Sequence, residues 1–195
     1  EIGLKREAQP LAAIEAVLAA EDPGRIFISA SPSDGDVHQW KLWHGFAPWT
    51  SLTEEQPPFM SEFGLQALPN LATVSQMFSG HPPRLLSDPR WRERKAQSAK
   101  LQYYANPPLQ GDLGFAVAAS QRAQMTALQV GIEASRLRRS KCGGVVFWQL
   151  NEPWPAVTWS VIDRAGRPKS AYEMLRHSFQ PLLIAARFPW RRYAM

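Results

Sequence analysis

Helical patterns alternate with short apolar runs along this chain, and this alternation is what most constrains its fold. Apolar residues fall at helical spacing within residues 8–21, and a turn at residues 22–24 ends that pattern. The next apolar run, residues 25–30, predicts a buried parallel strand. A helix followed by a short turn and an apolar strand is the repeating unit of α/β proteins. The chain is therefore predicted to build an α/β fold.

The same alternation continues to the end of the chain. We predict short strands within residues 40–43 and 57–60, helices at 71–78, 113–139 and 170–179, a surface stretch at 87–100, and a strand at 144–150. Three or four strands alternating with helices make about half of an eight-stranded barrel, which needs roughly 250 residues. The predicted fold class is α/β, the C-terminal part of a (β/α)8 TIM barrel. Residues 1–180 would form this partial barrel, and 181–195 would begin a linker or a following β-sandwich segment.

Composition excludes several classes of protein. With 195 residues, 45% of them hydrophobic, the chain can bury a sizeable core. The net charge of +5 raises the question of an anionic partner, but the basic residues stand in local groups without a nucleic-acid-binding motif. Solvated helix faces are the better explanation, so no nucleic-acid partner is expected. No run of about 18 apolar residues is present, so no membrane partner is expected either.

Two features bear on how the fold is stabilised and on chain integrity. The single cysteine, Cys142, excludes an internal disulfide. The chain begins at Glu1 without a methionine, which indicates a fragment of a longer protein. We expect a soluble protein that is cytoplasmic, or periplasmic or secreted if a signal peptide lies upstream.

Glu62 is the first candidate for chemistry. It lies in the tetrad Ser-Glu-Phe-Gly at residues 61–64, directly after the short strand that follows a proline turn. Barrel enzymes keep their catalytic groups at the carboxyl ends of strands. A glutamate there either points into a site or pairs with a local arginine, and spacing alone leaves both possibilities open.

Aromatic and polar side chains gather at two further places. His38 and Trp40 belong to a cluster with Trp43 and His44, and Trp148 and Asn151 stand where the second apolar strand ends. Indole faces stack on the apolar faces of sugar rings, and imidazole or amide groups bond hydroxyls. A zinc site would need a third ligand at suitable spacing, so a sugar subsite explains the clusters better than a metal does. Large aromatic residues that only fill the core are the alternative, and we assign Trp159 to packing.

Three ordered strings, at residues 35–45, 59–67 and 147–159, resemble the catalytic domain of glycoside hydrolase family 2, most of all its β-mannosidases. The resemblance implies a (β/α)8 barrel in which the Ser-Glu-Phe-Gly glutamate, Glu62, is the nucleophile. It also implies that Glu1 is the acid/base, and that Glu152 stands where many relatives carry aspartate. His38, Trp40, Trp148 and Asn151 would then bind substrate, with neither metal nor organic cofactor.

The expected function is a retaining exo-β-glycosidase that hydrolyses terminal β-linked mannose by double displacement, with a β-mannoside or related oligosaccharide as partner. The upstream half of the same enzyme would be needed, so the isolated chain is expected to be inactive. Another family 2 activity is the nearest alternative: exo-β-glucosaminidase, β-galactosidase or β-glucuronidase. A non-catalytic carbohydrate-binding protein is a more distant one, because such modules are usually small β-sandwiches and residues 113–139 predict a long helix.

Overall fold

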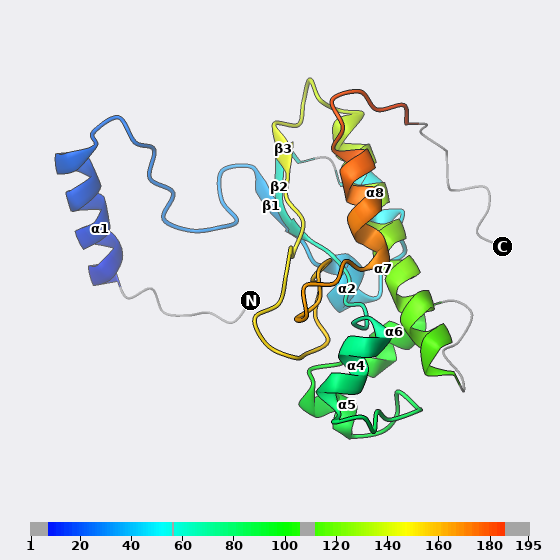
Figure 1. Cartoon of the computed structure of the whole chain (residues 1–195). Helices are drawn as coiled ribbons and strands as arrows, with labels where there is room; N and C mark the ends of the chain where they lie inside the picture. The colour runs from blue at the N-terminus through cyan, green and yellow to red at the C-terminus, as the bar shows by residue number, and fades with distance from the viewer. Residues whose placement is uncertain (1–7, 56, 106–111, 186–195) are drawn as a thin grey trace.

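The computed structural model describes residues 8–55, 57–105 and 112–185. Its centre is a parallel sheet of three strands in the order β1 (Asp36–Gln39), β2 (Phe59–Phe63) and β3 (Gly144–Val145). Backbone bonding to β2 continues past β3, where the amides of Val146 and Trp148 donate to the carbonyls of Met60 and Phe63, each at 2.8 Å. The α/β class is confirmed. The described strands form an open sheet and not a closed barrel (Figure 1).

Eight helices accompany the sheet in the described residues: α1 (Ala8–Glu21), α2 (Lys41–Gly45), α3 (Ser51–Glu54), α4 (Leu71–Met77), α5 (Arg90–Glu93), α6 (Ser98–Tyr104), α7 (Leu113–Arg136) and α8 (Ser170–Ser178). The long α7 lies beside α8 on one side of the sheet, and α4, α5 and α6 gather beyond one end of it (Figure 1). The helices predicted at 8–21, 71–78, 113–139 and 170–179 are thus confirmed to within a few residues.

Helix α7 carries the core. It begins after Asp112, whose carboxylate accepts a hydrogen bond from the amide of Gly114 at 2.9 Å and so caps the helix. Its buried face is rich in small residues, which allow close packing against the sheet. At Gly131 the approach is so close that a Cβ would lie 2.3 Å from the ring of Phe63.

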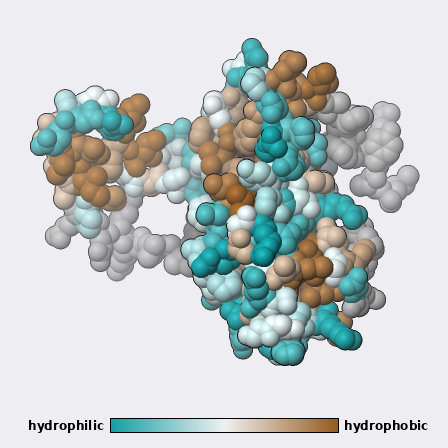
Figure 2. Space-filling view, viewed as in Figure 1, coloured by the Kyte–Doolittle hydropathy of each residue, from teal (hydrophilic) through white to brown (hydrophobic). Residues whose placement is uncertain are grey.

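The strand predicted at residues 25–30 is wrong. This segment is extended but unpaired, and Ile26 and Ile28 are 86% and 62% exposed. Together with α1 it forms an arm that stands apart from the sheet, with hydrophobic atoms on its surface (Figures 1 and 2). A buried parallel strand needs a neighbouring strand and covering helices. The described residues supply neither around this segment.

Two other predictions also need correction. Residues 40–43 do not form a strand, because the side-chain oxygen of Gln39 accepts the amide of Lys41 at 2.9 Å and the chain turns into α2. The stretch 87–100 is not all surface, because it contains α5 and the start of α6, and Trp91 is fully buried. The indole of Trp91 donates to the carbonyl of Leu85 at 3.1 Å, which satisfies its one polar atom.

The segment that follows β2, residues 64–69, is buried without regular secondary structure. Buried backbone groups need partners, and α7 supplies several of them. Gln124 donates to the carbonyl of Leu65 at 2.9 Å, and Gln121 donates to that of Leu68 at 3.1 Å. Ser120 accepts the amide of Leu68 at 3.1 Å. These bonds fix the chain immediately after Glu62.

Candidate active site

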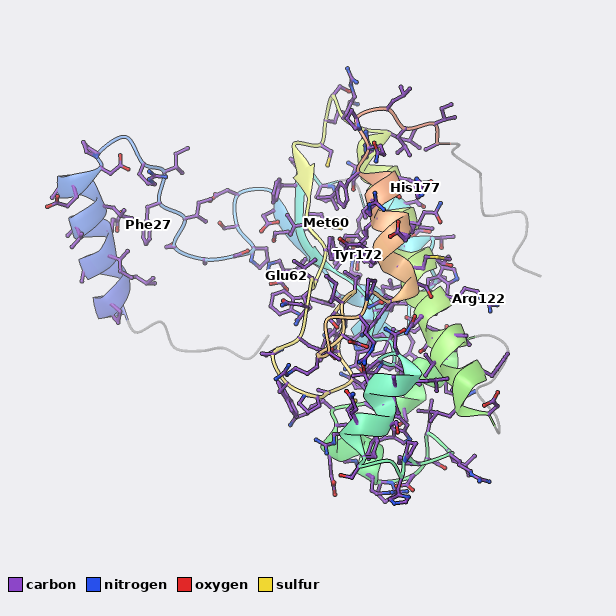
Figure 3. The ribbon with its side chains drawn as sticks, viewed as in Figure 1. Phe27, Met60, Glu62, Arg122, Tyr172 and His177 are labelled. Atoms are coloured by element: carbon purple, nitrogen blue, oxygen red, sulfur yellow. The ribbon has the colours of Figure 1, made fainter. Side chains whose placement is uncertain are left out.

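The carboxylate of Glu62 lies near the carboxyl end of β2, held by two groups from the first part of the chain. The indole N–H of Trp40 donates to Glu62 Oε2 at 3.0 Å, and His38 Nδ1 lies 3.5 Å from the same oxygen. The parallel register causes this meeting, because an irregularity after Val37 sets His38 opposite Glu62. The Glu62 side chain is 26% exposed, and Figure 3 shows it on the side of the sheet away from α7 and α8. It is oriented but open to a ligand.

A second set of hydrogen bonds continues from His38 away from Glu62. His38 Nε2 lies 3.0 Å from the hydroxyl of Ser31, which also donates to Asp36 at 3.0 Å. Asp36 in turn accepts the amide of Ser61 at 2.9 Å and its hydroxyl at 2.5 Å. Burial acts to raise the pKa of the Asp36 carboxyl, but the hydrogen bonds from Ser61 and Ser31 outweigh it and lower the pKa. The imidazole of His38 therefore lies between the carboxylate of Glu62 and the hydroxyl of Ser31, which links it to Asp36.

Aromatic rings form one wall of this site. The ring of Trp40 meets that of Trp159 edge-on, with centroids 6.0 Å apart. Trp43, which the sequence grouped with His38 and Trp40, is fully buried and stacks on Tyr104 at 5.9 Å. Trp43 is therefore a core residue. His44 lies at the surface, with its Nδ1 3.4 Å from the ammonium of Lys100. Partial burial of the ring and this positive charge lower the pKa of its imidazole.

Trp148 lines the same cleft as Trp159. The residue is 42% exposed, and the cleft, of about 580 Å³, is lined by Trp154 as well. The cleft is next to the Glu62 site because Trp159 borders both. Asn151 is exposed, and its carbonyl accepts the side-chain amide of Gln149 at 2.7 Å. The structure thus brings His38 and Trp40 to Glu62, places Trp148 in the neighbouring cleft, and gives no contact between Asn151 and Glu62.

Glu152 has a role that sequence reasoning missed. Its side chain is fully buried and accepts hydrogen bonds from Thr158 at 2.5 Å, from Ser160 at 2.7 Å and from the amide of Arg164 at 3.0 Å. The ammonium of Lys169, also fully buried, lies 3.9 Å away. Burial lowers the pKa of Lys169 to about 8 against the opposing attraction of Glu152 and Asp163. The position after Asn151 is thus structural, and the only sequence signal for it was a carboxylate beside an apolar strand.

Glu1, the expected acid/base, lies outside the described residues. Within the described ranges, no group of three or more His, Cys, Asp or Glu side chains is arranged to hold a metal ion. None of the helices described is both long and apolar enough to cross a membrane. What the described site offers chemically is one oriented, accessible carboxylate beside an imidazole and several indole faces.

Comparison with known proteins identifies relatives of this arrangement. Beta-mannosidase B of Emericella nidulans and that of Aspergillus niger are each 27% identical over 169 residues, which is 82% of this chain and 20% of the relative. The crystal structure of Beta-D-Mannosidase from Dictyoglomus thermophilum superposes with a TM-score of 0.71 at 28% identity, over 77% of this chain and 19% of that one. No protein-family model matches the chain.

The resemblance to β-mannosidases that three sequence motifs predicted is therefore confirmed. The chain spans about a fifth of the length of these curated relatives. The match covers 82% of this chain by sequence and 77% of it by structure.

Proposed function

We propose that this chain is part of a retaining exo-β-glycosidase that removes terminal β-linked mannose, with Glu62 as its nucleophile. The observation that carries the proposal is the position of the Glu62 carboxylate, 3.0 Å from the indole nitrogen of Trp40 and 3.5 Å from His38, at the carboxyl end of β2. The names of the relatives, Beta-mannosidase B and Beta-D-Mannosidase, supply the sugar.

The proposed chemistry needs two carboxyl groups. A retaining glycosidase holds them about 5–5.5 Å apart, so that one attacks the anomeric carbon while the other protonates the leaving oxygen. Glu62 forms the glycosyl ester, and its partner then deprotonates the water that releases the sugar. The N–H of Trp40 fixes one oxygen of Glu62, which leaves the other for attack. His38 and Trp40 would contact the sugar, together with Trp148 and Asn151 at the neighbouring strand end.

Glu62 is the one accessible carboxylate that the described residues bring to this site, since Asp36 is engaged by Ser31 and Ser61. We assign the second carboxyl group to Glu1. We further propose that residues 1–180 act as part of a (β/α)8 barrel completed by a longer polypeptide, with 181–195 leading to a linker or a following segment, and that the chain has no turnover by itself. The match to only 20% of the relatives' length supports this proposal.

The test exchanges the matching fifth of the Dictyoglomus thermophilum β-D-mannosidase for this chain and measures hydrolysis of 4-nitrophenyl β-D-mannoside. In this exchange enzyme, Glu62→Gln should lower kcat at least about a thousandfold, roughly 4 kcal/mol, because an amide cannot form the glycosyl ester. A 2-deoxy-2-fluoro mannoside should label Glu62, as read by peptide mass spectrometry. Labelling of another carboxylate, with Glu62 unmodified, would refute the assignment.

Glu173→Gln is the matched control. Glu173 pairs with Arg176 at 2.8 Å on α8, and both side chains are 62% exposed, so this change should leave kcat within about twofold. Glu1→Ala distinguishes the second role. It should spare substrates with activated leaving groups and recover activity with azide, whereas poor leaving groups lose most of their rate. Equal losses on both kinds of substrate would remove Glu1 from the acid/base role.

A further inference from the structure

The cleft beside the Glu62 site is lined by two cationic side chains that have no polar partner among the described residues. It is lined by three indoles, those of Trp148, Trp154 and Trp159, and by Arg92 and Lys95. Trp148 and Trp154 are each about two-fifths exposed, so their rings face solvent and not the core. The residues that line the cleft include no acidic side chain. Such a surface combines stacking faces with positive charge.

Neither of these two side chains forms an ion pair or a hydrogen bond within the described residues. The ion pairs and side-chain hydrogen bonds among the described residues include none from the Arg92 guanidinium or the Lys95 ammonium. Their neighbour Arg94 shows the contrast, because its guanidinium donates to the carbonyl of Met77 and lies over the ring of Phe78. Arg92 and Lys95 are exposed and line the cleft, so their N–H groups are available to a ligand.

Hydrogen bonds join the chain segments that line the cleft. The buried side chain of Gln66 donates to the carbonyl of Lys95 at 3.1 Å and accepts the amide of Gln97 at 3.0 Å. The amide of Val157 donates to the carbonyl of Arg94 at 2.7 Å, which joins the loop of Trp154 to the loop of the cations. A preformed site of this kind loses less entropy when it binds a ligand than a mobile one does.

We propose that this cleft binds the leaving-group side of the substrate, and that Arg92 and Lys95 select a sugar that carries a carboxylate. This inference rests on the proposed function, because Trp159 lines the cleft and its ring meets that of Trp40, which donates to Glu62. A sugar held by Glu62 would extend its reducing-end neighbour past Trp159 onto Trp148 and Trp154. Its carboxylate would then meet a guanidinium fork and an ammonium, which bind carboxylates through charge-assisted hydrogen bonds.

The experiment measures binding directly, so it does not depend on turnover. The 195-residue chain is titrated with two disaccharides, mannosyl-β-1,4-glucuronate and mannosyl-β-1,4-glucose, and its tryptophan fluorescence is followed. We expect the acidic compound to bind about three- to tenfold more tightly at low salt, which is the scale of two exposed ion pairs. This preference should shrink in about 0.5 M NaCl, because salt screens exposed charges.

The variant Arg92→Gln/Lys95→Gln should remove the preference and leave the affinity for the neutral compound unchanged. Arg122→Gln is the matched control, because Arg122 is an exposed cation on the far side of α7 (Figure 3), and it should keep the preference. Equal affinity for the two disaccharides, no binding of either, or an equal loss in the control would overturn the proposal. Selective binding of the acidic compound without hydrolysis by the exchange enzyme would retain the cleft and remove the proposed function.

Discussion

The contact between Gly64 and Trp148 allows a quantitative prediction about how the site is built. Gly64 ends the tetrad that contains Glu62, and a Cβ placed on it would lie 2.3 Å from the backbone oxygen of Trp148. Ordinary contact starts about 1 Å farther out, so Gly64→Ala must displace a strand backbone and not a flexible side chain. The adjacent hydrogen bond from the amide of Trp148 to the carbonyl of Phe63, at 2.8 Å, would be stretched or lost.

The expected cost of Gly64→Ala follows from these two effects. Overpacking a tight site costs about 1–3 kcal/mol, and a lost backbone hydrogen bond adds about 0.5–1.5 kcal/mol. The free energy of unfolding should therefore fall by about 2–4 kcal/mol, and Tm by roughly 5–15 °C for a chain of this size. Thermal and urea unfolding of the full chain, followed by circular dichroism, measures both quantities.

Gly45→Ala is the matched control for this prediction. Gly45 ends α2, and a Cβ there meets nothing within 4 Å, so the change should be neutral or slightly stabilising. If Gly64→Ala and Gly45→Ala unfold alike, the close approach of the two strand ends is not part of the folded state. The reasoning about how Trp148 is held beside Glu62 would then be refuted.

Two further predictions concern buried polar groups. The pKa of Lys169 is lowered to about 8 from 10.5, so the unfolded chain binds this proton more tightly than the folded one. Between about pH 8 and 10.5, the free energy of unfolding of the unmodified chain should therefore rise by on the order of 2 kcal/mol relative to that of Lys169→Met. If urea titrations show that the difference between the two proteins does not change with pH, the prediction is wrong. Gln124→Ala should cost about 2–3 kcal/mol, because three carbonyls, of Leu65, Trp159 and Ser160, lose their donor. The exposed Gln129→Ala should change stability by less than about 0.5 kcal/mol, and equal losses would show that the bonds of Gln124 do not matter.

Local patterns predicted α1, α4, α7 and α8, because helical periodicity is a short-range property, but they missed α2, α3, α5 and α6. The long helix was predicted over 113–139 and observed as Leu113–Arg136. Its buried face does not follow hydrophobicity alone. Phe115 and Leu137 are 38% and 48% exposed, whereas Gln121 and Gln124 are buried. This face packs against an irregular segment whose carbonyls need donors, and the two glutamines supply them.

The predicted strand at residues 25–30 failed for the opposite reason. Its apolar composition is typical of a strand. A strand, however, forms only when a neighbouring strand pairs with it, and a pattern of six residues does not show whether such a neighbour is present. The roles of the candidate site residues stay predictions, but the proximity of three of them is observed. Glu62, His38 and Trp40 were singled out from their residue types and positions, and the parallel register brings all three together. The part that could not be predicted is the distance between them, which depends on the irregularity after Val37.

The indoles of the proposed sugar site are positioned by a buried charge as well as by apolar packing. Trp154 and Trp159 lie on a loop that is bent around the buried carboxylate of Glu152, which accepts from Thr158, Ser160 and the amide of Arg164. Lys169 compensates this charge and donates to the carbonyl of Ala67 at 3.1 Å, in the segment that follows Glu62. A buried charge is stable only where hydrogen bonds and an opposite charge compensate its loss of hydration. One ion pair therefore couples the aromatic loop to the strand end that carries the proposed nucleophile, and a change at Glu152 would move both sides of the site together.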